Sequence, residues 1–187
     1  MSTILHLETA RLILRPFEQR DIQPFSAYRS DPYVAKYQGW QAPFSLEQAT
    51  RFVDEMMTRT PGEPGQWYQF ALELKKSGEM IGDCAFQRLA EDHAQAEIGF
   101  TLASPFQGQG YGTEAVRRLI DYLFGDLGLH RLRANCDPDN LASSRLLEKV
   151  GMRHEGHFVE SLWFKGVWAD EEWYAILQRE WTAKKLD

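Results

Sequence analysis

The alternation of apolar and polar positions along the chain predicts strands and helices in a mixed order. The first half holds a strand, two helices and a hairpin of two strands. A capping-box spacing joins Ser45 to Gln48 at the start of the second of these helices. The predicted elements are a strand at Arg11–Arg15, a helix opened by Asp21 that carries Phe25 and Tyr28, a helix from Ser45 to about Met57, and strands within Trp67–Lys75 and Glu79–Leu89 around a turn at Lys76-Ser77-Gly78.

The second half alternates strands with amphipathic helices. Apolar side chains fall at every second position from Ala94 to Leu102, which is typical of a strand. Apolar residues recur three and four positions apart from Ala115 to Phe124, which predicts a helix with one buried face. The remaining predicted elements are a strand at Leu132–Cys136, a helix at Asn140–Val150 ended by Gly151, and two strands within Arg153–Lys165 and Val167–Leu177.

This order of elements predicts the fold class. The strand-helix-strand units in the middle of the chain require strands that run partly in parallel. We therefore expect an α/β (α+β) fold, with a mixed, partly parallel central sheet of about seven strands flanked by about four helices. At 187 residues, the chain 1–187 fits a single domain.

Composition excludes several classes of protein. The net charge is −6 and no run of lysines or arginines stands out, which argues against a nucleic-acid partner. The apolar runs are too short to cross a membrane, and the first residues lack the pattern of a signal peptide. The two cysteines, Cys84 and Cys136, form neither a disulfide scaffold nor a CxxC metal motif, so no metal site is expected. Together these features predict a cytoplasmic protein.

The stretch from Gln107 to Gly112 carries the strongest chemical signal. Three glycines at alternate positions leave the backbone free to curl, and the helix that follows adds unpaired N–H groups and a positive dipole end. A strand, a glycine loop and a helix start in this order make an anion site suited to a diphosphate. The spacing fits neither GxxxxGK[ST] nor GxGxxG, but it matches [QR]-x-x-G-x-[GA].

With that motif, the chain resembles the GNAT superfamily of acetyl-CoA-dependent N-acetyltransferases, and in particular its branch of ribosomal-protein-alanine N-acetyltransferases. The similarity extends over nearly the whole chain, in the segments Glu8–Pro16, Ala96–Phe100, Asn140–Met152, Tyr174–Leu177 and Glu180-Trp181. The resemblance implies a GNAT-like domain with acetyl-CoA as co-substrate. It also implies that Leu102 offers an N–H to the thioester oxygen. The implied acetyl-CoA contacts are Phe100, Thr101, Leu102, Gln107, Gly108, Gln109, Gly110, Tyr111, Gly112, Thr113 and Asn140.

Acetyl transfer to an amine requires the amine to be neutral. At pH 7 deprotonation costs about 4.6 kcal/mol for a lysine of pKa ~10.4, but only about 1 kcal/mol for an α-amine near ~7.8. A carboxylate acting through water could serve the α-amine. Glu97 is the first candidate, because it shares a strand face with Thr101; the alternative is a solvated or ion-paired strand residue. Glu160 is a second candidate, and His93, His154 and His157 fall on no family position.

The leaving thiolate needs a proton donor, and here the chain departs from the family pattern. Many relatives carry a tyrosine seven residues after the asparagine, where this chain has Leu147. Ser143 is the best replacement, since it shares a helical stripe with apolar residues; the alternative is a hydrogen bond to its own helix. Cys136 is either a packed small side chain or a group near the thioester. Asn140 is a contact to the pantetheine amides, a helix N-cap, or both.

The acceptor is the least determined feature. Its walls are expected among Trp40, Phe44, Trp163, Phe164 and Trp168. The acceptor is either a protein N-terminal α-amine or a small molecule such as an aminoglycoside, polyamine or amino acid, and a third interpretation is a non-catalytic acyl-CoA-binding module. A homodimer is compatible with the aromatic content and common among similar enzymes.

Overall fold

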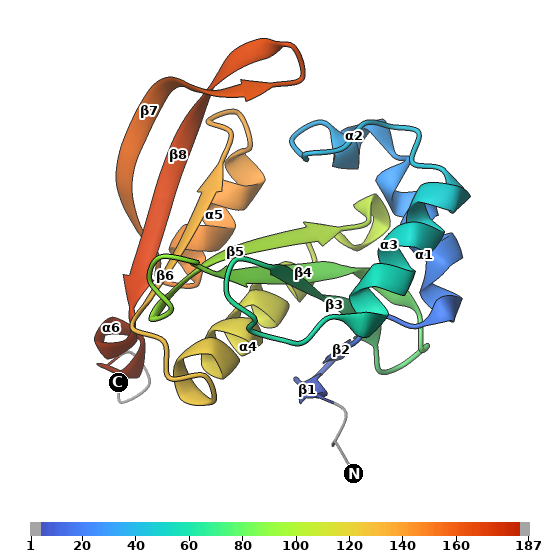
Figure 1. Ribbon diagram of the computed structural model, residues 1–187, viewed down its shortest axis with the longest axis horizontal. Helices are drawn as coiled ribbons and strands as arrows, with labels where there is room; N and C mark the ends of the chain where they lie inside the picture. The colour runs from blue at the N-terminus through green and yellow to red at the C-terminus, as the bar shows by residue number, and fades with distance from the viewer. Residues whose placement is uncertain (1–4, 184–187) are drawn as a thin grey trace.

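One mixed sheet of eight strands organises residues 5–183, the part of the chain that the computed structural model describes (Figure 1). The strand order is β1-β2-β3-β4-β5-β6-β8-β7. The strands are β1 Leu7–Glu8, β2 Leu12–Arg15, β3 Trp67–Leu74, β4 Met80–Arg88, β5 Gln95–Leu102, β6 Arg131–Cys136, β7 Arg153–Phe164 and β8 Val167–Leu177. The helices are α1 Ile22–Arg29, α2 Pro32–Ala35, α3 Leu46–Thr58, α4 Tyr111–Gly125, α5 Leu141–Lys149 and α6 Gln178–Ala183, with 3₁₀ turns η1 Gln19–Asp21 and η2 Ser104–Phe106.

The parallel pair at the centre of the sheet positions the site. β5 and β6 run in parallel and α4 makes the crossover between them, as a parallel connection requires. Their pairing ends at Glu97 and Arg133, although β5 continues to Leu102 and β6 to Cys136. The two strands therefore separate, and the second half of β5 turns an unpaired backbone edge toward β6.

Apolar side chains form a core on each face of the sheet. The face covered by α4 is packed by the predicted stripe of that helix, whose side chains from Ala115 to Leu123 are fully buried. The opposite face carries a second cluster contributed by α1 and α3, with aromatic rings such as Phe25 and Phe44 at its centre. Figure 1 shows these two helices beside β3 and β4.

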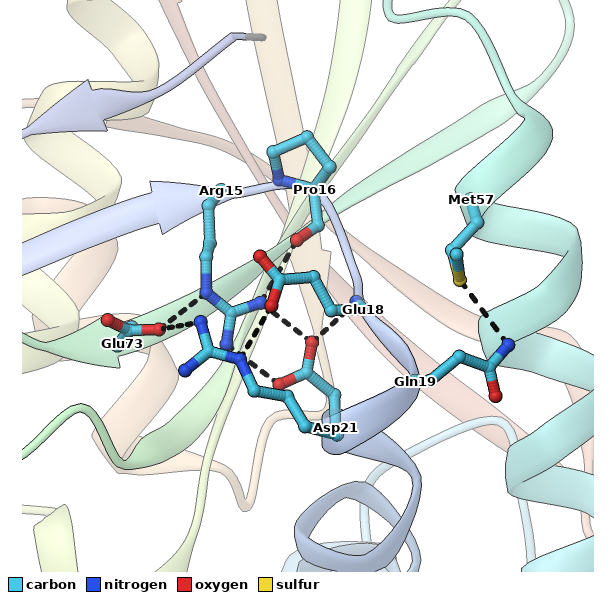
Figure 2. A network of polar contacts seen from close by, with 8 residues as sticks. Arg15, Pro16, Glu18, Gln19, Asp21, Met57 and Glu73 are labelled. Atoms are coloured by element: carbon cyan, nitrogen blue, oxygen red, sulfur yellow. Dashed lines mark hydrogen bonds and ion pairs between the residues drawn. The ribbon is translucent and has the colours of Figure 1, made fainter.

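A buried ion network joins β2 to the entry of α1 (Figure 2). Arg15 is 2% exposed and donates to both oxygens of Asp21, at 2.7 and 2.8 Å, and to Glu73 at 2.6 Å. Burial opposes the charge of Arg15, but these hydrogen bonds outweigh burial and raise the pKa of its guanidinium above the ordinary value. The network fixes β2, η1 and β3 relative to one another.

The structure confirms the predicted fold class and most of the predicted elements. The Ser45 side chain accepts from the Gln48 N–H and the Gln48 side chain accepts from the Ser45 N–H, as a capping box does. Within residues 5–183 the sheet has eight strands rather than about seven, and the fold has six α-helices rather than about four. The additional elements β1, α2 and α6 are two, four and six residues long, too short for an apolar repeat to reveal them.

The β7–β8 hairpin extends beyond the rest of the sheet and its tip approaches α2 (Figure 1). Lys165 at the tip donates from Nζ to the carbonyl oxygen of Ala35 at 2.7 Å.

Within residues 5–183, every helix is too short or too polar to traverse a lipid bilayer.

Candidate active site

The glycine loop between β5 and α4 is a curled backbone with free donors. Gly108 and Gly110 have φ of 73° and 82°, in the left-handed region that glycine adopts at little cost, and Gly110 caps α4 without a side chain. None of the residues 5–183 accepts a hydrogen bond from the backbone N–H groups of Gly108 through Thr113. A row of unpaired N–H groups at a helix start is the arrangement that binds a diphosphate.

Side chains brace this loop from outside. The amide of Gln107 donates to the carbonyl of Leu102 at 2.9 Å, and the amide of Gln109 donates to the carbonyl of Pro105 at 2.7 Å. Arg11 of the β1–β2 turn donates to the Gln109 carbonyl at 3.1 Å. These contacts use carbonyls and leave the N–H groups of the loop open.

Glu114 in the first turn of α4 anchors the helix to the β1–β2 turn. It accepts from the Thr9 hydroxyl at 2.6 Å, and from the N–H and the guanidinium of Arg11 at 2.8 and 2.6 Å. Burial acts to raise the pKa of Glu114, but these donors outweigh it, so its pKa lies below the ordinary value. A carboxylate at this end of the helix also complements the helix dipole.

The open edge of β5 presents the backbone donors expected of a thioester site. Ala103 donates its N–H to Ile81 on β4 at 2.9 Å. Since successive strand residues direct their N–H groups to opposite edges, the N–H groups of Leu102 and Phe100 point toward the gap between β5 and β6. This orientation agrees with Leu102 as an oxyanion donor.

Two cavities meet at this edge. The larger, of about 580 Å³, extends along the glycine loop and α5, and the smaller, of about 420 Å³, lies over the sheet between β3 and β6. They share residues from the α2–α3 loop, β5 and the start of α5. The shared residues are Tyr37, Gln38, Phe100, Thr101, Asn140 and Ser143.

The larger cavity contains most of the predicted cofactor contacts. It is lined by Phe100, Thr101, Leu102, Gln107, Gly108, Gly110, Gly112, Thr113 and Asn140. Gln109 and Tyr111 do not line it. The Arg11 guanidinium lies over the Tyr111 ring, with Cζ 4.3 Å from the ring centroid. Lys36, Arg145 and Lys149 also line this cavity and give it positive charge suited to phosphates. The residues present therefore fit acetyl-CoA.

The smaller cavity is built on one face of the sheet. Asp83 pairs with Thr101, Ala85 with Gly99, and Gln87 with Glu97, so these side chains lie on the same face. Ala85 and Gly99 leave the middle of this face open, and a Cβ added at Gly99 would meet nothing within 4 Å. Asp83 and Glu97 consequently lie on the same face of the sheet, on either side of the open positions Ala85 and Gly99.

Glu97 has the position predicted for it and an arginine partner. Nε of Arg133 on β6 donates to Oε2 of Glu97 at 3.1 Å, and Nη2 of the same guanidinium lies 3.0 Å from that oxygen. The Glu97 side chain is 18% exposed and lines the smaller cavity. Glu97 is thus ion-paired, which is one of the two alternatives drawn from the sequence, and it lines the smaller cavity. Its role as a general base stays a prediction.

Asp83 is a second carboxylate in this cavity that the sequence prediction missed. It is 3% exposed, accepts a hydrogen bond from the Tyr28 hydroxyl and lies 3.8 Å from Nη2 of Arg29. Burial raises the pKa of Asp83 above its ordinary value, while Arg29 and Tyr28 act in the opposite direction. One signal was available: Asp83 is the only charged residue within the apolar stretch Met80–Phe86.

The start of α5 brings Ser143 and Asn140 to the junction of the two cavities. Asn140 caps α5, its Oδ1 accepting from the Ser143 N–H at 3.3 Å. Within residues 5–183, the Ser143 hydroxyl makes no hydrogen bond, whereas it is Ser144 that bonds back to the Asn140 carbonyl at 3.5 Å. Leu147 is buried in the core, so no acid stands at the usual tyrosine position.

Cys136 lines the smaller cavity, which is the candidate acceptor cavity, and is half-buried, with Sγ 3.3 Å from the Ser144 hydroxyl. Burial raises the pKa of its thiol, so Cys136 is a weak source of thiolate.

Several other candidates lie elsewhere. Glu160 and the three histidines do not line either cavity, and His154 and His157 hydrogen-bond to Glu172 on the exposed hairpin. Of the five aromatic residues expected at the acceptor walls, Trp40 lines the smaller cavity, whereas Phe44 packs in the core and Trp163, Phe164 and Trp168 lie on the hairpin.

The sheet with two separating parallel strands, the free N–H row and the adjoining acceptor cavity define an acyl-CoA-dependent acyltransferase. The model of the acetyltransferase (GNAT) domain matches residues 11–153. The chain therefore belongs to the GNAT family, and it is an acetyl-CoA-dependent N-acetyltransferase.

Individual relatives agree with this assignment. The chain is 35% identical to the uncharacterized N-acetyltransferase YnaD of Bacillus subtilis, over 95% of this chain and 100% of that protein. It is 25% identical to the [ribosomal protein uS5]-alanine N-acetyltransferase of Escherichia coli, over 95% and 93%. A GNAT acetyltransferase structure from Bacillus anthracis superposes with a TM-score of 0.84 at 31% identity, over 94% and 99% of the two chains.

Proposed function

We propose that this N-acetyltransferase acts on the α-amine of a protein or peptide N-terminus, by direct attack in a ternary complex. The observation that carries the proposal is the meeting of the two cavities at Phe100, Thr101 and Ser143. An amine that enters from the smaller cavity reaches a thioester held in the larger one without a covalent enzyme intermediate. The similarity to a ribosomal-protein-alanine N-acetyltransferase supports the choice of acceptor.

The chain's residues have distinct roles in this reaction. The neutral amine nitrogen attacks the thioester carbonyl carbon, and the carbon–sulfur bond breaks to release CoA. Glu97 takes the proton that the amine loses, through a water molecule, and the Leu102 N–H stabilises the charge that develops on the carbonyl oxygen. Ser143 donates a hydrogen bond to the leaving sulfur. The Gly108–Thr113 N–H row and Asn140 hold the CoA diphosphate and pantetheine.

A small-molecule amine is the second candidate acceptor, since the cavity of about 420 Å³ also has room for a polyamine or amino acid.

The cytoplasmic location of the protein and its assembly into a homodimer stay predictions.

An acceptor screen tests the proposed function. Release of CoA thiol is measured with acetyl-CoA and each of three acceptors: an alanine-led tetrapeptide, the same peptide with its N-terminus blocked but a free lysine, and spermidine. We expect release with the free N-terminus and little with the blocked peptide, because the α-amine is cheaper to deprotonate. Faster release with spermidine would assign the enzyme to small-molecule amines instead, and acetyl-CoA binding with no release would exclude catalysis.

A further inference from the structure

The cofactor cavity carries positive charge although the protein as a whole is acidic. The net charge of the chain is −6. Among the described residues that line the larger cavity, the charged ones are Lys36, Arg145 and Lys149, and none is a carboxylate. The smaller cavity, by contrast, contains both Asp83 and Glu97. The larger cavity therefore has a local field that attracts a strongly anionic ligand to an otherwise repelling molecule.

Two of these three cations have no partner in the protein. Arg145 and Lys149 are exposed on α5, and within residues 5–183 their side chains make neither a hydrogen bond nor an ion pair. Glu148 lies three positions after Arg145, a spacing at which opposite charges can pair on a helix, yet the two stay apart. Lys149 in the last turn complements the helix dipole, but Arg145 four positions earlier only adds like charge beside it. An anionic ligand accounts for both cations.

The position of the pair along α5 distinguishes it from the diphosphate site. The helix is nine residues long, and Ser143 in its first turn lies at the junction of the two cavities. Leu146 marks where α5 meets the glycine loop, since a Cβ added at Gly112 would lie 2.8 Å from Leu146 Cδ1. Lys149 comes about 4.5 Å further along the helix axis. Arg145 and Lys149 therefore lie beside and beyond the glycine loop, away from the junction.

The third cation, Lys36, belongs to the other end of the cavity. Its Nζ donates to the Tyr37 hydroxyl at 2.8 Å, and that hydroxyl donates to the carbonyl of Asp139 at 3.2 Å. Asp139 lies just before the cap of α5, so Lys36 is near the start of this helix. Arg145 and Lys149 remain as the cations of the far end.

CoA carries two anionic groups of different chemistry, and the chain offers two different kinds of donor. The diphosphate is matched by the backbone N–H groups of the glycine loop and by a helix start worth about half a positive charge. The other group is the phosphate on the 3′ oxygen of the ribose, on the far side of the diphosphate from the thioester. A phosphate monoester has a charge of about −1.5 to −2 at pH 7, which full cations such as a guanidinium and an ammonium match better than neutral N–H groups.

We infer that Arg145 and Lys149 bind the 3′-phosphate of acetyl-CoA and make the enzyme selective for a 3′-phosphorylated acetyl donor. Acetyl thioesters that end at the pantetheine, or whose nucleotide lacks the 3′-phosphate, are then poor donors. The inference concerns the donor alone and holds for either class of amine acceptor.

Binding of CoA and of 3′-dephospho-CoA, compared by calorimetry, provides the test. The second compound keeps the diphosphate and the pantetheine and lacks only the 3′-phosphate. The parent enzyme should bind CoA about tenfold more tightly, because two exposed charge-assisted contacts are lost with the phosphate. In the double variant Arg145→Gln/Lys149→Gln, the Kd for CoA should rise about tenfold and the Kd for 3′-dephospho-CoA by less than about threefold. Salt at about 1 M should reduce the preference of the parent enzyme, since it screens exposed charges.

Lys76→Gln/Arg179→Gln is the matched control, because it removes the same two charges from exposed positions on the β3–β4 turn and α6 that line neither cavity. It should keep the full preference for CoA. Equal Kd values of the parent enzyme for the two compounds would overturn the inference. An equal loss of both compounds in Arg145→Gln/Lys149→Gln would assign the cations to the diphosphate instead, and the same loss of preference in the control would reduce their effect to general charge; either result also overturns it.

Discussion

Two carboxylates on one sheet face have different surroundings, and this difference separates their roles. Glu97 is held by an arginine of the neighbouring strand near the open edge of β5. Asp83 lies deeper, with Tyr28 and Arg29 around it. An accessible carboxylate can exchange protons through water, whereas a buried one with fixed partners is better suited to orient a ligand.

Glu97→Gln tests the role of the first carboxylate. The amide keeps the shape of the side chain but cannot take a proton, so kcat should fall about 100-fold or more, and the acidic limb of the pH–rate profile should disappear. Stopped-assay measurement of kcat between pH 6 and 9 with the alanine-led peptide checks this. The KM for acetyl-CoA should be unchanged, because Glu97 does not line the cofactor cavity.

Glu91→Gln, on the exposed β4–β5 turn, is the control and should behave as the parent enzyme. A kcat for Glu97→Gln within about threefold of the parent would mean that no general base acts there.

At the residue scale, the sequence predicts the position of a side chain where that position depends on residues close to it along the chain. The Glu97 position follows from the alternation of β5, and the Asn140 cap from its place before a helix. Asp83 shows the limit: its partners Tyr28 and Arg29 precede it by more than fifty residues. A polar residue in a strand only becomes part of a site when the fold brings such distant groups to it.

At the scale of elements, the loop and helix that hold the diphosphate depend on backbone shape. Gly110 has a φ of 82° and is the cap of α4, so its conformation sets the direction of the N–H groups that follow. Gly112 serves a different purpose, since a Cβ there would lie 2.8 Å from Cδ1 of Leu146 on α5, and that side chain would have to move. The alternate spacing of the glycines therefore combines a turn with a close helix contact.

Gly110→Ala tests the turn. A side chain in the left-handed region costs about 1–2 kcal/mol, so the free energy of unfolding in urea should fall by that amount, and the Kd for acetyl-CoA measured by calorimetry should rise. Gly125→Ala in the same helix is the control, because Gly125 has no positive φ and an added Cβ meets nothing within 4 Å. It should raise the free energy of unfolding by up to about 1 kcal/mol. Equal effects of the two substitutions would contradict the role of the turn.

Elements with a strong local pattern were predictable and short ones were not. The capping box of α3 and the apolar stripe of α4 arise from contacts within one or two helical turns. β1 pairs through only two residues, Leu7 and Glu8, with partners in β2, and α2 is a four-residue turn capped by Asp31. Such segments take their structure from the neighbours on which they pack rather than from a repeat of their own.

At the scale of the whole molecule, the arrangement of strands decides where the chemistry takes place. Chain order alone does not show that β8 pairs with β6 and places β7 at the edge. It also does not show that β5 and β6 separate after Glu97 and Arg133. Both follow from long-range packing, and the separation creates the junction where an acyl donor meets an amine.

Because the cofactor cavity is lined by residues from α2, β5, α4 and α5, ligand binding should stabilise the whole fold. At acetyl-CoA 100-fold above its Kd, linkage adds about 2.7 kcal/mol to the free energy of unfolding. For a chain of this size the Tm should then rise by about 5–10 °C in a thermal unfolding scan. Acetyl-pantetheine at the same concentration lacks the diphosphate and should raise the Tm much less, since it cannot use the N–H groups of Gly108 to Thr113. Equal shifts with both compounds would place the binding energy in the pantetheine arm and remove the glycine loop from the cofactor site.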